Sequence, residues 1–327
     1  MAEFYDVVEL STAVKPWLLG HLLNERGLER VAYFDPDIRI YDRLDRVNQL
    51  TREYELVLIP HVTSPMPRDG KKPSEADILI AGTYNLGFIA LERGPRTDKL
   101  LGWWSERLKT DCVVAPELGY FVDQRWIDFI HGVMPGFHVL NDPGYNVAYW
   151  NLHGRELTNK KGRYYVNGEP LRFFHFSGFD PHHRDRLSKH QNRIKLRRGS
   201  ALARICDEYA KALLEHGYNE VKDWPYTYGT LPNGVRLSPG MRRLYRAGTE
   251  SGELEVSIFT LEGADRLVAW LNEPAPVGGE YGVTRYLYEI YSKRADLRRA
   301  FPNLDSPDAA RFIAWGQTHG NVELPVP

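Results

Sequence analysis

The feature that most constrains the fold is an alternation of apolar runs of strand length with amphipathic runs of helix length in the N-terminal third of the 327-residue chain. The strand-like runs are Val31–Phe34, Glu55–Pro60 and Tyr84–Leu91. The helix-like runs are one that Ser11 or Thr12 caps and Gly27 ends, a short one at Ser74–Ile80, and an amphipathic one at Thr97–Leu108. This alternation predicts a mixed or parallel α/β sheet.

Two aspartates, Asp35 and Asp37, follow the first strand-like run and enclose Pro36. Ligands of α/β sheets gather beyond the carboxyl ends of strands, and the two aspartates stand at such an end. Two carboxylates on a backbone restricted by proline can hold a hard divalent cation that keeps positions open for phosphate oxygens. The alternative is ordinary turn chemistry, which Asp and Pro both favour and which the tripeptide alone indicates more strongly.

The stretch "YYVNGEPLRFFHF" predicts a β-hairpin turning at Asn167 and Gly168, with His175 on its second strand. A lone histidine among aromatic residues is most often a partly buried packing residue. Gly178 indicates a tight turn or the close approach of a ligand. The two carboxylates, the distant imidazole and the nearby glycine together favour a metal site.

Several polar residues can be explained either by a ligand-binding site or by ordinary packing. Asn85 lies in an apolar run, where its amide must find hydrogen-bond partners in the protein or a ligand. Asp123 and Gln124 begin a predicted helix, so they offer an acceptor and an amide for a reacting carbon, or Asp123 is an N-cap. Tyr145 and Asn146 suit a sugar, and a packed loop explains them equally well.

A change to polar, basic sequence predicts a boundary near residue 181, and a Pro/Gly-rich loop at 272–282 predicts another. We therefore expect three regions: 1–180, 181–271 and 272–327. The run 184–198 can contact a diphosphate, a lipid-linked acceptor or a membrane surface, with Lys189 as the candidate phosphate ligand; the alternative is a solvated helix face. Further helices are predicted at Ser200–His216, Thr284–Ala300 and Ser306–His319.

Composition narrows the classes of partner. The 42 basic and 43 acidic residues give a net charge of −1, so no overall field attracts nucleic acid or anionic lipid. The two cysteines, Cys112 and Cys206, lack the spacing of a disulfide framework or a zinc site. Neither a secretion signal nor a long apolar run is evident. We expect a cytoplasmic protein whose membrane contact is at most peripheral, through 184–198.

Six motifs follow one another along the chain: "TAVKPWLL", "YFDPDI", "YNLGFIAL", "FVDQRWID", "GYNVAYW" and "HFSGF". Taken in order, they resemble those of bacterial glycosyltransferases of the GT-A fold, most closely the retaining, glycogenin-like and galactosyltransferase-like group. The resemblance covers about residues 5–180, and its specificity lies in the order of the motifs. The resemblance implies a GT-A sheet and transfer of a sugar from a nucleotide-diphosphate donor to a glycan or lipid-linked acceptor, in the synthesis of a surface polysaccharide.

The resemblance also implies roles for individual residues. Mn²⁺ or Mg²⁺ is expected to bridge the donor diphosphate to the protein, and Lys15 and Asn85 to contact the donor. Asp123 and Gln124 are expected to flank the anomeric carbon. The metal ligands that the resemblance implies are Asp35, Asp37 and His175, and the remaining candidate donor contacts are Tyr145, Asn146, Gly178 and Lys189.

The sequence departs from the pattern of the group at two places. Pro181 stands where the group has a phosphate-binding lysine, so Lys189 or another residue of the basic run is expected to substitute. The chain starts at the helix that carries Lys15, so we expect a GT-A domain that lacks its first βαβ portion and has a helical C-terminal extension. Two alternatives follow: a catalytically silent glycan-binding or scaffolding fragment, and, more weakly, a phosphatase built on the two aspartates.

Overall fold

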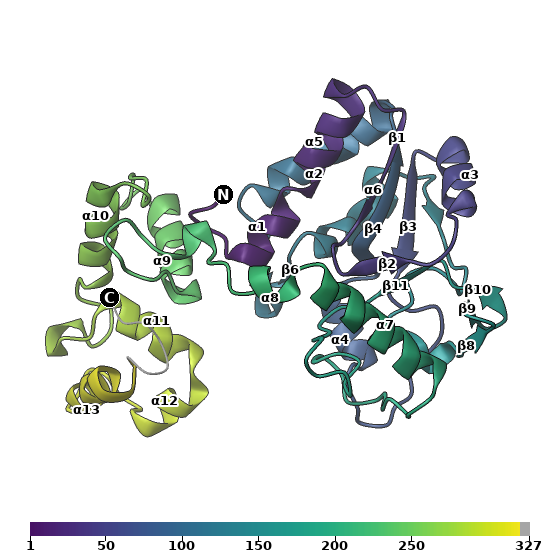
Figure 1. Ribbon diagram of the computed structural model, residues 1–327. Coiled ribbons are helices and arrows are strands. Elements are labelled where there is room, and N and C mark those ends of the chain that lie inside the picture. The colour runs from purple at the N-terminus through teal and green to yellow at the C-terminus, as the bar shows by residue number, and fades with distance from the viewer. Residues whose placement is uncertain (321–327) are drawn as a thin grey trace. The chain divides into compact units, whose positions relative to one another are not determined.

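The computed structural model describes residues 1–320 and is a mixed α/β structure with a C-terminal helical region (Figure 1). The chain forms two compact units. One unit contains Ser11–Trp224, and the other combines Met1–Leu10 with the chain from Pro225 onwards. Among the described residues, no helix is long and apolar enough to span a membrane.

The main sheet of the Ser11–Trp224 unit has four strands in the order β1-β4-β3-β7. Strands β1 and β3 are antiparallel to β4, and β7 is parallel to β3, so the predicted mixed sheet is confirmed. In the inner strand β4 all residues except the last are buried, which agrees with its nearly continuous apolar sequence. The bounds are β1 (Arg30–Phe34), β3 (Leu56–Pro60), β4 (Tyr84–Glu92) and β7 (His138–Val139).

Helices flank this sheet. Helix α5 (Pro95–Leu108) packs against α2 (Lys15–Gly20) and buries its predicted apolar face, including Trp104. The predicted cap at Ser11 or Thr12 is wrong, because the Asp6 carboxylate accepts the Val8 and Glu9 N–H groups and starts a helix earlier. Other elements before residue 134 include α1 (Val7–Ala13), a π-helical turn (His21–Glu25), α3 (Asp45–Glu53), α4 (Glu75–Ala81), β5 (Val114–Ala115), β6 (Tyr120–Phe121), a 3₁₀ segment (Gln124–Phe129) and α6 (Ile130–Val133).

The predicted hairpin is present but does not carry His175. Asn167 and Gly168 both have positive φ, 51° and 89°, as the turn requires. The second strand ends at Pro170, because the Arg172 N–H donates to the carbonyl of Gly144 (2.8 Å) and the chain leaves the hairpin. His175 lies on a separate strand that pairs with β2. These strands are β2 (Ile38–Ile40), β8 (Leu157–Lys160), β9 (Arg163–Val166), β10 (Glu169–Pro170) and β11 (Phe173–His175).

The first unit continues past the predicted boundary near residue 181. Helix α7 (Ala201–Glu215) buries Ile205, Cys206 and Tyr209 in one core with residues of β9 and β11, and Tyr209 stacks on Phe176 at 3.8 Å. The unit ends after a short helix, α8 (Tyr218–Val221). The residues 184–198 lie in turns and irregular backbone, so the alternative of a solvated helix face is wrong.

The helices after Pro225 share a second core. Ala275, inside the predicted loop, and Val283, directly after it, are buried in that core, so the predicted division at residue 272 falls inside one packed unit. Thr284–Ala300 forms two helices rather than one, because Arg294 adopts extended dihedrals. The helices are α9 (Pro239–Glu250), α10 (Leu261–Leu271), α11 (Arg285–Lys293), α12 (Ala295–Ala300) and α13 (Asp308–Trp315), which continues into a π-helical turn (Gly316–Gly320).

Candidate metal centre

Three potential metal ligands meet within the Ser11–Trp224 unit. One ligand atom each of Asp35, Asp37 and His175 lies within 4.8 Å of the other two. The Nε2 atom of His175 is 2.9 Å from Asp37 Oδ1 and 3.9 Å from Asp35 Oδ2. The imidazole is only 4% exposed, whereas the carboxylates of Asp35 and Asp37 are 25% and 40% exposed. The cluster is therefore buried on one side and open to a ligand on the other.

Strand pairing brings the three residues together. The antiparallel register of β1 and β4 lets the Asp35 N–H donate to the carbonyl of Gly87 (2.8 Å). His175 lies opposite Ile38 on β2, next to Asp37. The Ile38 N–H donates to the Asp35 carbonyl (3.0 Å), so the Asp-Pro-Asp segment is a turn as well as a pair of candidate ligands. The two interpretations of this tripeptide are therefore compatible.

Asn85 forms a hydrogen bond with the ring nitrogen of His175 that does not face the aspartates. Its Oδ1 atom lies 3.2 Å from His175 Nδ1 and 3.0 Å from Asn146 Nδ2, which donates to it. Because an amide oxygen only accepts, Nδ1 of His175 carries a proton and Nε2 faces the two aspartates. This is how metal-binding histidines are usually oriented, with the non-ligating nitrogen donating to a fixed acceptor.

A second buried histidine fixes the orientation of Asn85. Nδ1 of His61 donates to the carbonyl of Gly82 (2.8 Å), so its Nε2 atom is left to accept the Asn85 Nδ2–H (3.3 Å). Burial lowers the pKa of His61 to about 4, which keeps this ring neutral near pH 7. Asn85 thus uses both ends of its amide inside the protein, while its predicted contact with a donor sugar stays a prediction.

Gly87 is a position beside the candidate metal centre that the sequence analysis missed. A Cβ atom at this position would lie 2.4 Å from His175 Cε1 and 2.8 Å from Asn85 Oδ1. Any other residue would therefore push the imidazole away from the aspartates. A glycine inside an otherwise apolar strand was the available signal, because it often marks a close approach by another group.

Lys15 lies on the other side of Asp35. Its Nζ atom is 3.3 Å from Asp35 Oδ1 and 2.9 Å from Asp123 Oδ2, and it donates to the carbonyl of Leu86 (3.0 Å). The Tyr33 hydroxyl also donates to Asp35 Oδ1, at 2.8 Å. Burial alone would lower the pKa of Lys15, but Asp123 and Asp35 outweigh it, so its pKa is raised and the ammonium stays charged.

Asp123 is almost completely buried, at 1% exposed. Burial raises the pKa of its carboxyl group, and the ammonium of Lys15 opposes that shift. Asp123 occupies the N-cap position of the 3₁₀ segment but makes no side-chain capping bond. The carboxylate therefore neutralises Lys15 rather than acting as an ordinary cap.

The other predicted residues are positioned mainly by packing. Gln124 donates to the carbonyl of Ala81 (2.9 Å), and Tyr145, 3% exposed, packs edge-on against Phe173. Asn146 adopts a left-handed backbone (φ 49°), and its buried Oδ1 atom has no hydrogen-bond partner among the described residues. Of these three, the structure brings only Asn146 next to the residues that hold His175.

Gly178 and Lys189 meet at the start of the basic run. The Lys189 N–H donates to the carbonyl of Gly178 (3.0 Å). A Cβ atom at Gly178, which has φ 68°, would lie 2.4 Å from a ring carbon of His190, so the predicted close approach is made by the protein itself. The Lys189 side chain is exposed, whereas Arg193 is buried against the 69–73 loop through Asp69 Oδ2 (2.5 Å) and the carbonyl of Pro73.

Comparison with known proteins identifies distant relatives and no family. No family model matches the chain, and no solved structure matches it. Two curated proteins of Bacillus subtilis (strain 168) are similar to it, and both are named as uncharacterized. YfnF is 31% identical over 181 residues, which is 55% of this chain and 59% of YfnF. YfnD is 28% identical over 174 residues, which is 52% of this chain and 54% of YfnD.

Proposed function

We propose that this chain is a glycosyltransferase of the GT-A type that moves a sugar from a nucleotide-diphosphate donor to a glycan acceptor during synthesis of a surface polysaccharide. The observation that carries the proposal is the convergence of Asp35, Asp37 and His175 on one open-faced cluster. The order of the motifs supports the same reading.

The donor atoms of the cluster fit Mn²⁺ or Mg²⁺. Carboxylate oxygens suit hard cations such as Mg²⁺ and Mn²⁺, and imidazole nitrogen suits transition metals, so two oxygens and one nitrogen favour Mn²⁺. A divalent cation bound there would neutralise charge on a departing diphosphate. The protein's own contribution is orientation: Asn85 and His61 hold the imidazole, and Lys15 and Tyr33 hold one carboxylate.

Two further features of the proposal follow from the resemblance. The acceptor hydroxyl is expected to attack the anomeric carbon with retention of configuration, which NMR of the product would establish. The exposed basic residues of 184–198, among them Lys189 and Arg197, support contact with the phosphate of a lipid-linked acceptor at the cytoplasmic membrane surface.

The test is Mn²⁺-dependent release of UDP or GDP from a panel of nucleotide sugars by the full chain. Removing a metal ligand that is partly exposed should abolish function without unfolding the protein, so Asp37→Asn is expected to reduce release at least about 100-fold. Asp45→Asn, on an exposed aspartate at the start of α3, is the matched control and should retain full release.

Release that is undiminished in Asp37→Asn contradicts the proposal. Calorimetry with glycans and with nucleotide sugars separates it from the second candidate. Glycan binding without any nucleotide-sugar binding would favour a catalytically silent glycan-binding protein.

A further inference from the structure

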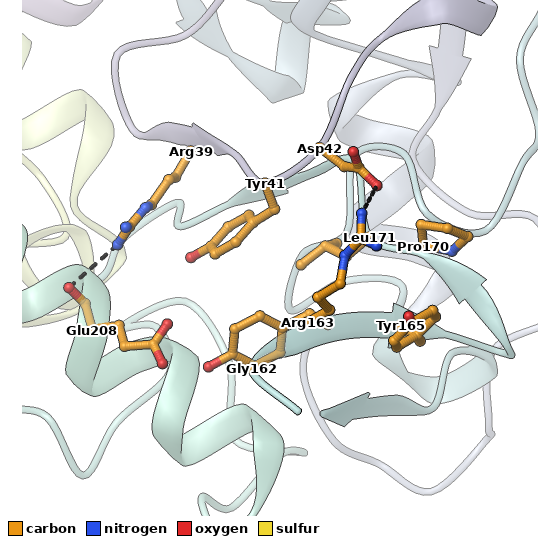
Figure 2. Close-up of a pocket in the computed structure, with 10 residues that line it drawn as sticks. Arg39, Tyr41, Asp42, Gly162, Arg163, Tyr165, Pro170, Leu171 and Glu208 are labelled. Carbon is orange, nitrogen blue, oxygen red and sulfur yellow. Dashed lines mark hydrogen bonds and ion pairs between the residues drawn. The ribbon is translucent and has the colours of Figure 1, made fainter. Parts of the chain in front are cut away.

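A polar hollow opens where β2, β9 and α7 meet (Figure 2). Its volume of about 230 Å³ lies below the range of roughly 300–1,000 Å³ that is usual for drug-sized ligands. The hollow therefore has room for one ring-sized group. The residues that its chemistry depends on are Arg39, Tyr41, Asp42, Arg163, Tyr165 and Glu208.

One end of the hollow offers hydrogen-bond donors. The Tyr41 hydroxyl has no hydrogen-bond partner among the described residues, and burial raises its pKa, so it keeps its proton. The Arg39 guanidinium donates to the backbone carbonyl of Glu208 (3.3 Å) and lies 5.2 Å from the centre of the Tyr41 ring. The Tyr41 hydroxyl oxygen is buried, so a ligand in the hollow meets the Tyr41 ring rather than its hydroxyl.

The other end offers one acceptor, Asp42, and a second arginine, Arg163. Asp42 Oδ2 lies 3.6 Å from Arg163 Nη2 and 3.5 Å from Arg172 Nη1, so no short hydrogen bond occupies it. A second acceptor, the exposed Glu208 of α7, lies at the Arg39 end and opposite Tyr165, as Figure 2 shows. The two arginines Arg39 and Arg163 are balanced by two acids, which disfavours a phosphate or another simple anion.

This combination of neutral overall charge, intermixed donors and acceptors, and tyrosine rings suits a hydroxyl-rich ring. The hollow and the candidate metal centre also share their strands. Arg39 follows Asp37 by two residues and is paired with Phe174, the residue before His175. Along extended chain, Tyr41 lies roughly 13 Å from Asp37, at about 3.3 Å per residue.

We infer that this hollow is a subsite for a neutral sugar unit of the glycan acceptor, held beside the metal centre while a neighbouring unit reacts. The inference rests on the proposed glycosyltransferase function. It assigns Arg163 and Glu208 to acceptor binding and leaves donor binding to the metal centre.

The test is calorimetric binding of four neutral tetrasaccharides to the full chain: maltotetraose, cellotetraose, mannotetraose and galactotetraose. At least one is expected to bind. Arg163→Ala removes a charged donor and Glu208→Gln replaces a charged acceptor with a neutral one, so each should weaken binding about tenfold. Both side chains are exposed, so the variants should fold. Asp207→Asn, at the exposed neighbouring position of α7, is the matched control and should bind like the wild type.

The inference is overturned if no tetrasaccharide binds at millimolar concentration, or if Arg163→Ala binds as tightly as Asp207→Asn. Binding of pyrophosphate that Arg163→Ala abolishes would assign the hollow to an anion and overturn it as well. Nucleotide release without acceptor is measured in parallel on the wild type and on Asp207→Asn, and should be the same in both. Glycan binding without nucleotide release would support the proposed subsite and contradict the proposed transferase activity. Nucleotide release without glycan binding would support the transferase activity and contradict the subsite.

Discussion

At the scale of single residues, the candidate metal centre depends on a chain of oriented side chains. The carbonyl of Gly82 fixes His61, His61 fixes Asn85, and Asn85 fixes His175. In each of these hydrogen bonds, one group can only accept or only donate, which fixes the role of its partner. The imidazole of His175 therefore presents Nε2 to the aspartates. Because the His175 side chain is already held in this orientation, no conformational entropy is lost in ordering it when a cation binds.

Replacing Asn85 tests this relay. Asn85→Ala removes the acceptor of the His175 Nδ1–H and should weaken Mn²⁺ binding about 10- to 100-fold. Asn85→Asp keeps an acceptor at that place and should retain clearly more affinity than Asn85→Ala. Isothermal calorimetry with Mn²⁺ measures both. Equal affinity of the two variants would show that Asn85 does not orient the imidazole.

His61 predicts a pH dependence of stability. In the unfolded chain a histidine takes up a proton near pH 6.5, and in the folded protein burial lowers the pKa of His61 to about 4. Between these values only the unfolded chain binds the proton, so stability from this group is complete above about pH 6.5 and is lost as the pH falls to about 4. The loss amounts to roughly 3 kcal/mol at 1.36 kcal/mol per pKa unit.

The measurement is urea unfolding of the wild type and of His61→Gln between pH 7 and pH 4. The free energy of unfolding should fall more steeply in the wild type, so the difference between the two proteins narrows as the pH is lowered. Parallel pH profiles would mean that His61 titrates normally in the folded protein.

At the scale of elements, local sequence patterns predicted most strands and helices of the sheet region, whereas contacts between distant segments decided the places that were predicted wrongly. Apolar runs placed β1, β3, β4 and α5 within a few residues, because their patterns are long and their ends carry capping or turn residues. His175 was placed on the wrong strand, since the carbonyl of Gly144, distant in sequence, draws the chain away from the hairpin. His61 and Gly87 were missed because their roles depend on contacts that no local pattern contains.

Helix α7 was predicted to belong to a separate region, 181–271, but it packs into the core of the Ser11–Trp224 unit. Tyr209 is 7% exposed and stacks on Phe176, one residue after His175. Tyr209→Ala should therefore cost about 3–5 kcal/mol of stability, as for other buried aromatic side chains. Tyr209→Phe keeps the ring and should cost less than about 1.5 kcal/mol. Chemical denaturation measures both, and a near-neutral Tyr209→Ala would contradict the shared core.

At the scale of the whole molecule, the candidate metal centre and the hollow belong to one compact unit, Ser11–Trp224. Two strands, β2 and β11, connect them: Asp37 and His175 stand at one end of the pair, and Arg39 lies inside it. An enzyme that joins a donor to an acceptor needs two sites held at a fixed separation. In the proposed transferase, the pairing of β2 with β11 would fix the distance between the metal centre and the hollow.

The central claim is that Asp35, Asp37 and His175 hold a divalent cation. The most direct test is a crystal grown with Mn²⁺ and measured for anomalous scattering. The account predicts an anomalous peak at bonding distance from one oxygen of each aspartate and from Nε2 of His175, and no peak there in Asp37→Asn. A wild-type crystal with no peak at this cluster, or with His175 turned away from the aspartates, would contradict it.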